Sequence, residues 1–266
     1  MSDNDLNKGV GKPLIVAGLG DISAQLDSCF VPLGLQPESG FAVRKYLGEI
    51  NGRSLTVTVA LRSRNRYAGG VVRYRQFTGL WMDISAATPV MTRLMLGQPK
   101  GMARSFVQYV QQLRGNKPVP HLPAAYDGLV AFAREPAWGE TFLADTAVQN
   151  HITALMHDPD LPPGAAVHLS PSGLDSPGKW IWTTPAMPND FTPESAQRWV
   201  YSLAHLAAHA EQSPPMTAVP PSWLEQQSPR TTGFLVAAVL LFGIPFLLFV
   251  CCMVPAFILI ILTGAR

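Results

Sequence analysis

The sequence predicts an α+β fold with an antiparallel, β-rich N-terminal half, an α+β second half and a single C-terminal transmembrane helix. Apolar and polar residues alternate with strand-like spacing through 41–97, and segments with helical spacing of apolar residues follow. Residues 233–262 form a run of 30 residues without a charged or amide side chain. We therefore expect a disordered stretch (1–11), a β-rich basic subdomain (12–117), an acidic α+β subdomain (118–212), a proline-rich tether (213–231) and a transmembrane helix (232–263).

The clearest strands surround an Asn51-Gly52 pair, which supplies the positive φ angles that a two-residue hairpin turn requires. In the strand after this turn, one face carries Leu55, Val57, Val59 and Leu61, and threonines and arginines share the other. Further strands are expected, in order along the chain, at 71–77, 79–86 and 92–97. One water-exposed face on an antiparallel sheet explains this alternation.

Helices and strands are mixed in the rest of the chain. A short helix is possible at 21–30, and an amphipathic helix is expected from 102 to a stop at Gly115. Beyond the proline-rich break at 115–125, we expect a strand at 126–133, one or two helices in 138–158 and a hairpin in 165–185. Thr192 suits the N-cap of a final helix that runs to about Gln212.

The apolar run exceeds the roughly 20 residues that a membrane-spanning helix needs. Pro245 and Pro255 favour a bend there, so a shallow re-entrant hairpin is the alternative to a single crossing. The segment 213–229, with five prolines, is expected to be a semi-rigid tether. The first residues lack the basic start and apolar core of a secretory signal, which predicts a cytoplasmic N-terminal domain.

Positive charge is concentrated in the first half. Residues 43–117 hold 13 Lys or Arg against 2 acids, and residues 118–229 hold 3 against 11. One predicted hairpin carries a group of five arginines: Arg62, Arg64, Arg66, Arg73 and Arg75. We expect these arginines to be the candidate contact surface for an anionic partner.

Several interpretations of this basic hairpin remain open. The basic half could dock on the acidic half, or the arginines could be a solvated strand face. They could instead contact anionic lipid headgroups or an acidic protein. Aromatic residues among the arginines would also suit nucleic acid, but no accompanying RNA- or DNA-binding motif is present, so nucleic acid is disfavoured.

Catalytic signals are weak. His205 and His209 have the four-residue spacing of zinc ligands on a helix, but the glutamate of the HExxH motif is missing. No phosphate-binding loop is present, and no cofactor is expected. The sequence therefore favours a membrane-anchored binding or scaffold module that is not an enzyme. The alternative is a membrane-tethered, hydrolase-like enzyme with its site between the two halves.

Overall fold

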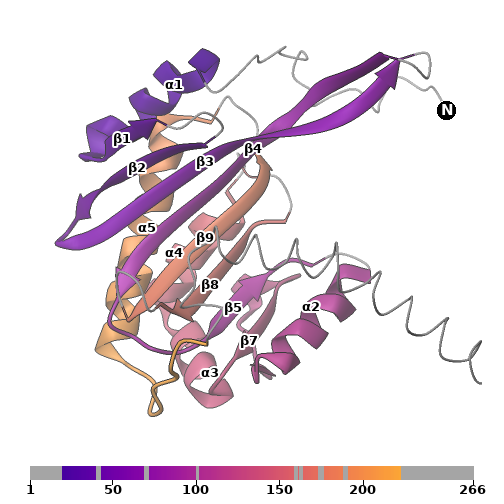
Figure 1. Ribbon diagram of the computed structural model, residues 1–266. Helices are drawn as coiled ribbons and strands as arrows, with labels where there is room; N and C mark the ends of the chain where they lie inside the picture. Colours follow the sequence, from indigo (N-terminus) through magenta and orange to yellow (C-terminus); the bar gives the residue numbers. More distant parts are fainter. Residues whose placement is uncertain are drawn as a thin grey trace, which may run out of the picture. The chain divides into compact units, whose positions relative to one another are not determined.

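The computed structural model describes an antiparallel sheet with helices, which confirms the predicted α+β class. The described residues are 20–39, 43–68, 72–99, 102–158, 161, 164–172, 177–187 and 191–222. Within them the sheet has nine strands, in the order β1-β2-β3-β4-β9-β8-β5-β7-β6 (Figure 1). The strands are β1 (Gln36–Ser39), β2 (Val43–Ile50), β3 (Arg53–Ala68), β4 (Val72–Thr88), β5 (Leu94–Gly97), β6 (Lys117–Pro118), β7 (Val130–Ala133), β8 (Ala166–Pro171) and β9 (Gly178–Met187).

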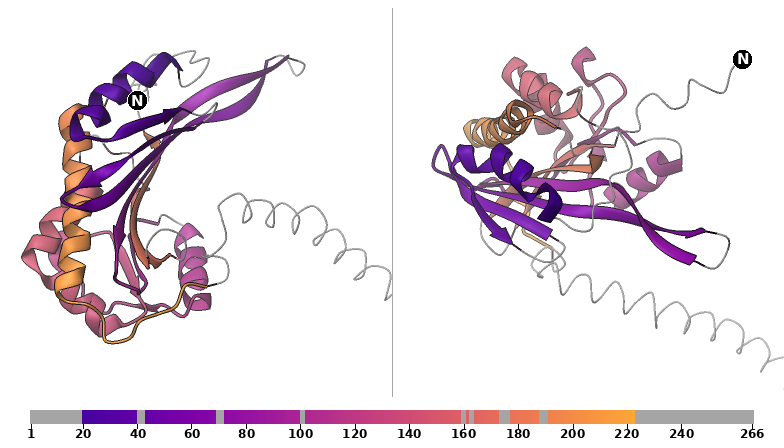
Figure 2. Two further views of the ribbon diagram at one scale, coloured as in Figure 1. Left: turned by 60° about the vertical axis from the view of Figure 1, so that its left-hand side comes forward. Right: turned by 90° about the horizontal axis from the view of Figure 1, so that it is seen from above.

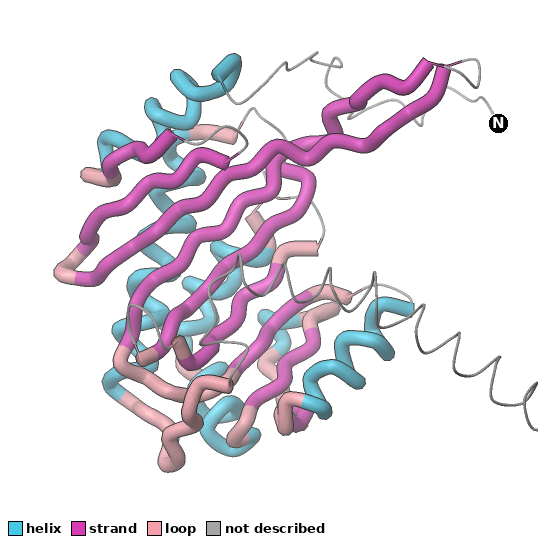
Figure 3. Tube along the Cα trace, viewed as in Figure 1, coloured by secondary structure: helices cyan, strands magenta, loops and turns pink. Residues whose placement is uncertain are grey.

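Five α-helices accompany the sheet in the described part of the chain: α1 (Gly20–Phe30), α2 (Met102–Leu113), α3 (Pro136–Ala144), α4 (Thr146–Met156) and α5 (Pro193–Gln212). Short 3-10 turns follow α1 (Val31–Leu33) and precede β7 (Ala124–Tyr126). Figure 2 shows α1, α4 and α5 on one face of the sheet and α2 on the opposite face. Of the described helices, only α2 lies on that opposite face (Figure 3).

Local sequence signals account for most element boundaries. The predicted hairpin turn is confirmed by positive φ angles at Asn51 (53°) and Gly52 (71°). The Thr192 hydroxyl accepts a 3.2 Å hydrogen bond from the Ser195 N–H and caps α5 as predicted. The expected strands at 71–77 and 79–86 are wrong as separate elements. They form the single strand β4, with a bulge opposite Arg62.

The core lies between the sheet and α5. In the predicted apolar row of β3, Leu55, Val57 and Val59 are buried, and Leu61 at the end of the row is only partly buried. Trp182 of β9 packs against Trp199 of α5 with ring centroids 5.1 Å apart. Both indole N–H groups have hydrogen-bond partners: Trp182 donates to the Leu155 carbonyl at 2.8 Å and Trp199 to Asp158 at 3.0 Å.

Two ion pairs fasten helices to this sheet. Arg53, at the start of β3, donates to both carboxylate oxygens of Glu211 on α5, at 2.5 and 2.9 Å. Arg44 of β2 binds the Asp27 carboxylate of α1 at 2.6 Å. The hydrogen bonds from Arg53 and from Thr88 lower the pKa of Glu211. These contacts fix both ends of the layer formed by α1 and α5.

The two predicted halves share one sheet. β5 comes from the first half and lies between β8 and β7, which come from the second half. The boundary expected at residue 118 falls within β6, at the edge of the sheet. The chain up to Pro220 forms one compact unit, because strands from both halves bury one continuous core.

The first residues of the expected tether contact this unit. The Trp138 indole donates to the Ser213 carbonyl at 2.7 Å, and Glu135 accepts the Thr217 N–H at 2.7 Å. The Val219 N–H bonds to the Met91 carbonyl at 2.8 Å, and the Val219 side chain is buried. Residues 213–220 therefore pack against the domain, where the sequence predicted a semi-rigid tether rather than packed structure.

None of the helices in the described ranges has both the length and the apolar character needed to cross a bilayer. The predicted transmembrane segment 232–263 lies outside the described residues, as does the expected disordered stretch 1–11.

Candidate functional site

Strands β3 and β4 extend beyond their neighbours as a two-stranded ribbon. β2 pairs with β3 only as far as Ala60, and β9 pairs with β4 only from Leu80 onward. The segments 61–68 and 72–79 therefore pair only with each other among the described strands. We call these two segments the basic ribbon. It projects from the sheet, away from α4 and α5 (Figures 1 and 2).

All five arginines singled out from the sequence lie on the basic ribbon. In the strand register, Arg62 is opposite Gly79, Arg64 opposite Gln76, Arg66 opposite Tyr74, Arg73 opposite Tyr67 and Arg75 opposite Asn65. The Arg62 side chain is exposed, and the other four side chains lie outside the described part of the structure. No aspartate or glutamate occurs anywhere in 61–79, so the ribbon holds no carboxylate of its own to offset these charges.

The position of the ribbon bears on the possibility that the basic half docks on the acidic half. The acidic residues of the second half that the structure places on helices lie on α3, α4 and α5 or at their ends. Those helices cover one face of the sheet, and the ribbon leaves the sheet in another direction (Figure 2). Within the described residues, the acidic helices therefore do not cover the basic ribbon.

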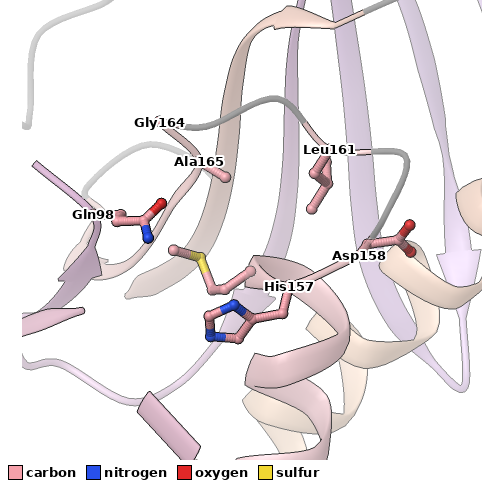
Figure 4. Close-up of a pocket in the computed structure, with 7 residues that line it drawn as sticks. Gln98, His157, Asp158, Leu161, Gly164 and Ala165 are labelled. Carbon is pink, nitrogen blue, oxygen red and sulfur yellow. The ribbon is translucent and has the colours of Figure 1, made fainter. Parts of the chain in front are cut away.

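A hollow of about 220 Å³ lies beside the C-terminal end of α4. We call it the α4 hollow, and Figure 4 shows the residues that line it: Gln98, Met156, His157, Asp158, Leu161, Gly164 and Ala165. The Asp158 carboxylate points away from the hollow in this view. It instead binds Arg198 at 2.5 Å, with the Asp158 side chain 0% exposed, and accepts the Trp199 N–H. This carboxylate therefore has a structural role.

A second hollow, of about 280 Å³, lies between α2 and the sheet, on the sheet face opposite to α5. We call it the α2 hollow, and its polar lining residues are Arg93, Gln111, Arg114, Asn116, His168, Ser170 and Thr183. Burial, together with the nearby charge of Arg114, lowers the pKa of His168 to about 4. His168 is therefore neutral at pH 7. Next to this hollow, the Thr183 hydroxyl donates a hydrogen bond to Asp83, and burial raises the pKa of Asp83 to about 6.

The α2 hollow joins the two predicted halves, where the enzyme interpretation placed its site. That interpretation needs a nucleophile within hydrogen-bond reach of a base. Among the described residues, no hydrogen bond links a histidine to a serine, threonine or cysteine hydroxyl or thiol. The geometry in this part of the chain therefore provides a polar hollow without an assembled catalytic pair.

The structure also adds a histidine to the pair noted in the sequence. His151 of α4 stacks on His205 of α5, with centroids 4.9 Å apart, and lies 6.0 Å from the His209 ring. Burial and these two neighbours lower the pKa of His151. Over the described residues, no cluster of three histidine, cysteine or acidic residues is arranged to hold a metal ion. The sequence could not indicate His151, because it lies 54 residues before His205.

Comparison of the chain with protein-family models, with curated proteins and with solved structures finds no match.

Proposed function

We propose that the protein is a single-pass, C-terminally membrane-anchored binding module with its folded domain in the cytoplasm. In this proposal the basic ribbon contacts the anionic lipid headgroups of the membrane that holds the chain. The observation that carries it is a projecting two-stranded ribbon with five arginines and no acidic residue. The apolar run 233–262 supports the anchor, since no charged or amide side chain interrupts it.

The energetics favour such a contact. Each basic residue near an anionic leaflet contributes about 1 kcal/mol, and the attraction falls off over a Debye length of about 10 Å. An anchor on the same chain would raise the effective concentration of the ribbon at the surface. A two-stranded ribbon without a third strand is only marginally stable in water, so a binding surface would also stabilise the ribbon itself.

The anchor predicts how the full-length chain fractionates. We expect it to sediment with membranes, to remain there after an alkaline carbonate wash and to dissolve only in detergent. The matched control is a chain that ends at residue 222, which keeps the compact unit and lacks the apolar run. We expect the alkaline carbonate wash to release this shortened chain into the supernatant. Recovery of the intact full-length chain in the supernatant, without detergent or aggregation, would refute the anchor.

The ribbon predicts salt-sensitive binding to anionic vesicles. We expect residues 1–222 to co-sediment with phosphatidylglycerol-containing vesicles and not with phosphatidylcholine vesicles alone. Replacing Arg62, Arg64 and Arg66 with glutamine removes three charges and should weaken binding at least tenfold, since each contributes about 1 kcal/mol.

The control for this variant is Lys45→Gln, Arg104→Gln and Lys117→Gln, which removes the same charge from exposed positions outside the ribbon. We expect the control to bind nearly as well as the parent. Equal losses in both variants would mean that net charge, and not the ribbon, governs binding. Absence of vesicle binding by the parent would favour an acidic protein as the partner.

A further inference from the structure

The α2 hollow has the electrostatic character of an anion site. Two of its lining residues are arginines, Arg93 and Arg114, and none of the described lining residues is acidic. Arg93 is held in place by a 3.4 Å hydrogen bond from its guanidinium to the Pro220 carbonyl. Arg114 is exposed at the rim, and no hydrogen bond or ion pair to the described residues engages its guanidinium. This positive lining favours a negatively charged occupant.

The α2 hollow is also lined by Asn116, a buried residue that carries an acceptor without a partner. The Asn116 side chain is only 3% exposed and lines the hollow. Its Nδ2 donates to Gln111 Oε1 at 2.7 Å. Its Oδ1 is buried and has no hydrogen-bond partner among the described residues. Because a buried acceptor without a partner is energetically unfavourable, a donor on a ligand would be stabilising here.

The end of α2 places Asn116 in this position. Gly115 has a φ of 73°, its N–H bonds to the Gln112 carbonyl at 2.8 Å, and the Asn116 N–H bonds to the Gln111 carbonyl at 2.9 Å. These two bonds form a Schellman motif, which reverses the chain directly after the helix. The motif turns Asn116 back toward the sheet and leaves Arg114 on the last turn. A single local structure thus positions a cation and an acceptor beside the same hollow.

His168 and Ser170 complete the polar wall from β8. The two residues are separated by one position on the strand, so they share a face of the sheet. Neither side chain has a hydrogen bond to another described residue. A neutral imidazole and a hydroxyl can each either donate or accept a hydrogen bond. They can therefore bind further oxygens of a small oxyanion without adding charge.

We propose that the α2 hollow binds a small oxyanion that carries its own hydrogen-bond donor, namely hydrogen phosphate or the monoprotonated phosphate of a monoester. The anionic oxygens would contact Arg114, and the P–O–H group would donate to Asn116 Oδ1. This arrangement discriminates by proton content. Sulfate at neutral pH has the same shape and charge but no O–H, so one of its oxygens would face the Asn116 oxygen without a hydrogen between them.

The test is calorimetric titration of the purified full-length protein in neutral detergent with inorganic phosphate and with sulfate, at pH 7 and constant ionic strength. We expect saturable phosphate binding and sulfate binding at least tenfold weaker. Arg114→Gln should weaken phosphate binding at least tenfold, because a charge-assisted contact is lost. Arg104→Gln, exposed near the other end of α2, is the matched control and should bind phosphate as the parent does.

Asn116→Ala isolates the donor contact. We expect it to lower phosphate affinity and to bring the phosphate-to-sulfate ratio close to one, with the thermal unfolding midpoint recorded to confirm that it folds. If this variant does not fold, Arg114→Gln against Arg104→Gln still decides the result, because both changes are at exposed positions. Three results would each overturn the proposal: no saturable phosphate binding, equal affinity for sulfate, or Arg114→Gln binding as well as Arg104→Gln.

Discussion

Replacing Asp158 with alanine should lower the free energy of unfolding of the 1–222 fragment by about 3 kcal/mol. Asp158 is buried at the end of α4, where one carboxylate oxygen accepts hydrogen bonds from Arg198 at 2.9 and 2.5 Å and from the Trp199 indole at 3.0 Å. Hydrogen bonds to a charged group contribute about 1.5–3 kcal/mol each, and an unsatisfied buried donor costs about 1–3 kcal/mol. The Arg198 side chain is 45% exposed, so water offsets part of the loss.

Urea unfolding followed by tryptophan fluorescence measures this free energy, since unfolding exposes the buried Trp199 to solvent. Asp158→Asn keeps an acceptor for the indole and loses only the charge, so its effect should be smaller. Asp127→Ala is the control, because Asp127 is exposed, and it should change the free energy of unfolding by less than about 0.5 kcal/mol. If Asp158→Ala lowers the free energy of unfolding no more than this control does, the hydrogen bonds from Arg198 and Trp199 to Asp158 do not stabilise the domain.

His168 should make the domain sensitive to acid between about pH 6.5 and pH 4. Its pKa is about 4 in the folded state, against about 6.5 in an unfolded chain. The folded state therefore disfavours the charged imidazole, and stability is lost as pH falls through this window. At 1.36 kcal/mol per pKa unit, the loss approaches about 3 kcal/mol at pH 4. Asp83 acts in the opposite sense, because its raised pKa favours the folded state as pH falls.

Comparison with His168→Gln isolates this effect. The free energies of unfolding of parent and variant are measured in urea at pH 7, 5 and 4. We expect the stability of His168→Gln relative to the parent to increase by about 3 kcal/mol from pH 7 to pH 4. His157→Gln, which alters an exposed histidine at the α4 hollow, is the matched control measured in the same way. A His168→Gln curve parallel to that of the parent would contradict the assigned cause.

Sequence reasoning succeeded where the signal is local. The Asn51-Gly52 turn, the Thr192 cap and the end of α2 before Gly115 are each decided by residues within one turn of the boundary. It failed at Gly79, where a break between strands was expected. Gly79 has a φ of 127°, and the chain passes this position as a bulge within one strand. A glycine before an apolar run is found both at a break between two strands and at a bulge within one strand. Only the pairing of β4 with β3 distinguishes the two.

The two candidate sites differ in how far the sequence revealed them. The arginines of the basic ribbon were found from strand spacing, since they lie close together along the chain. The α2 hollow was not found, because Arg93, Asn116 and His168 come from three segments that meet only when β5 pairs with β8. The residue pattern within β5 cannot indicate that it pairs with β8, a strand about 70 residues away.

By itself, the sequence determined the α+β class, most element boundaries, the concentration of positive charge on one hairpin and the apolar run near the C-terminus. These properties depend on side chains that are neighbours along the chain. The tertiary structure alone decided that both halves share one sheet, that the ribbon extends beyond its neighbouring strands and that 213–220 packs on the domain. Such features arise from burying one common core, whose free energy depends on contacts between distant segments.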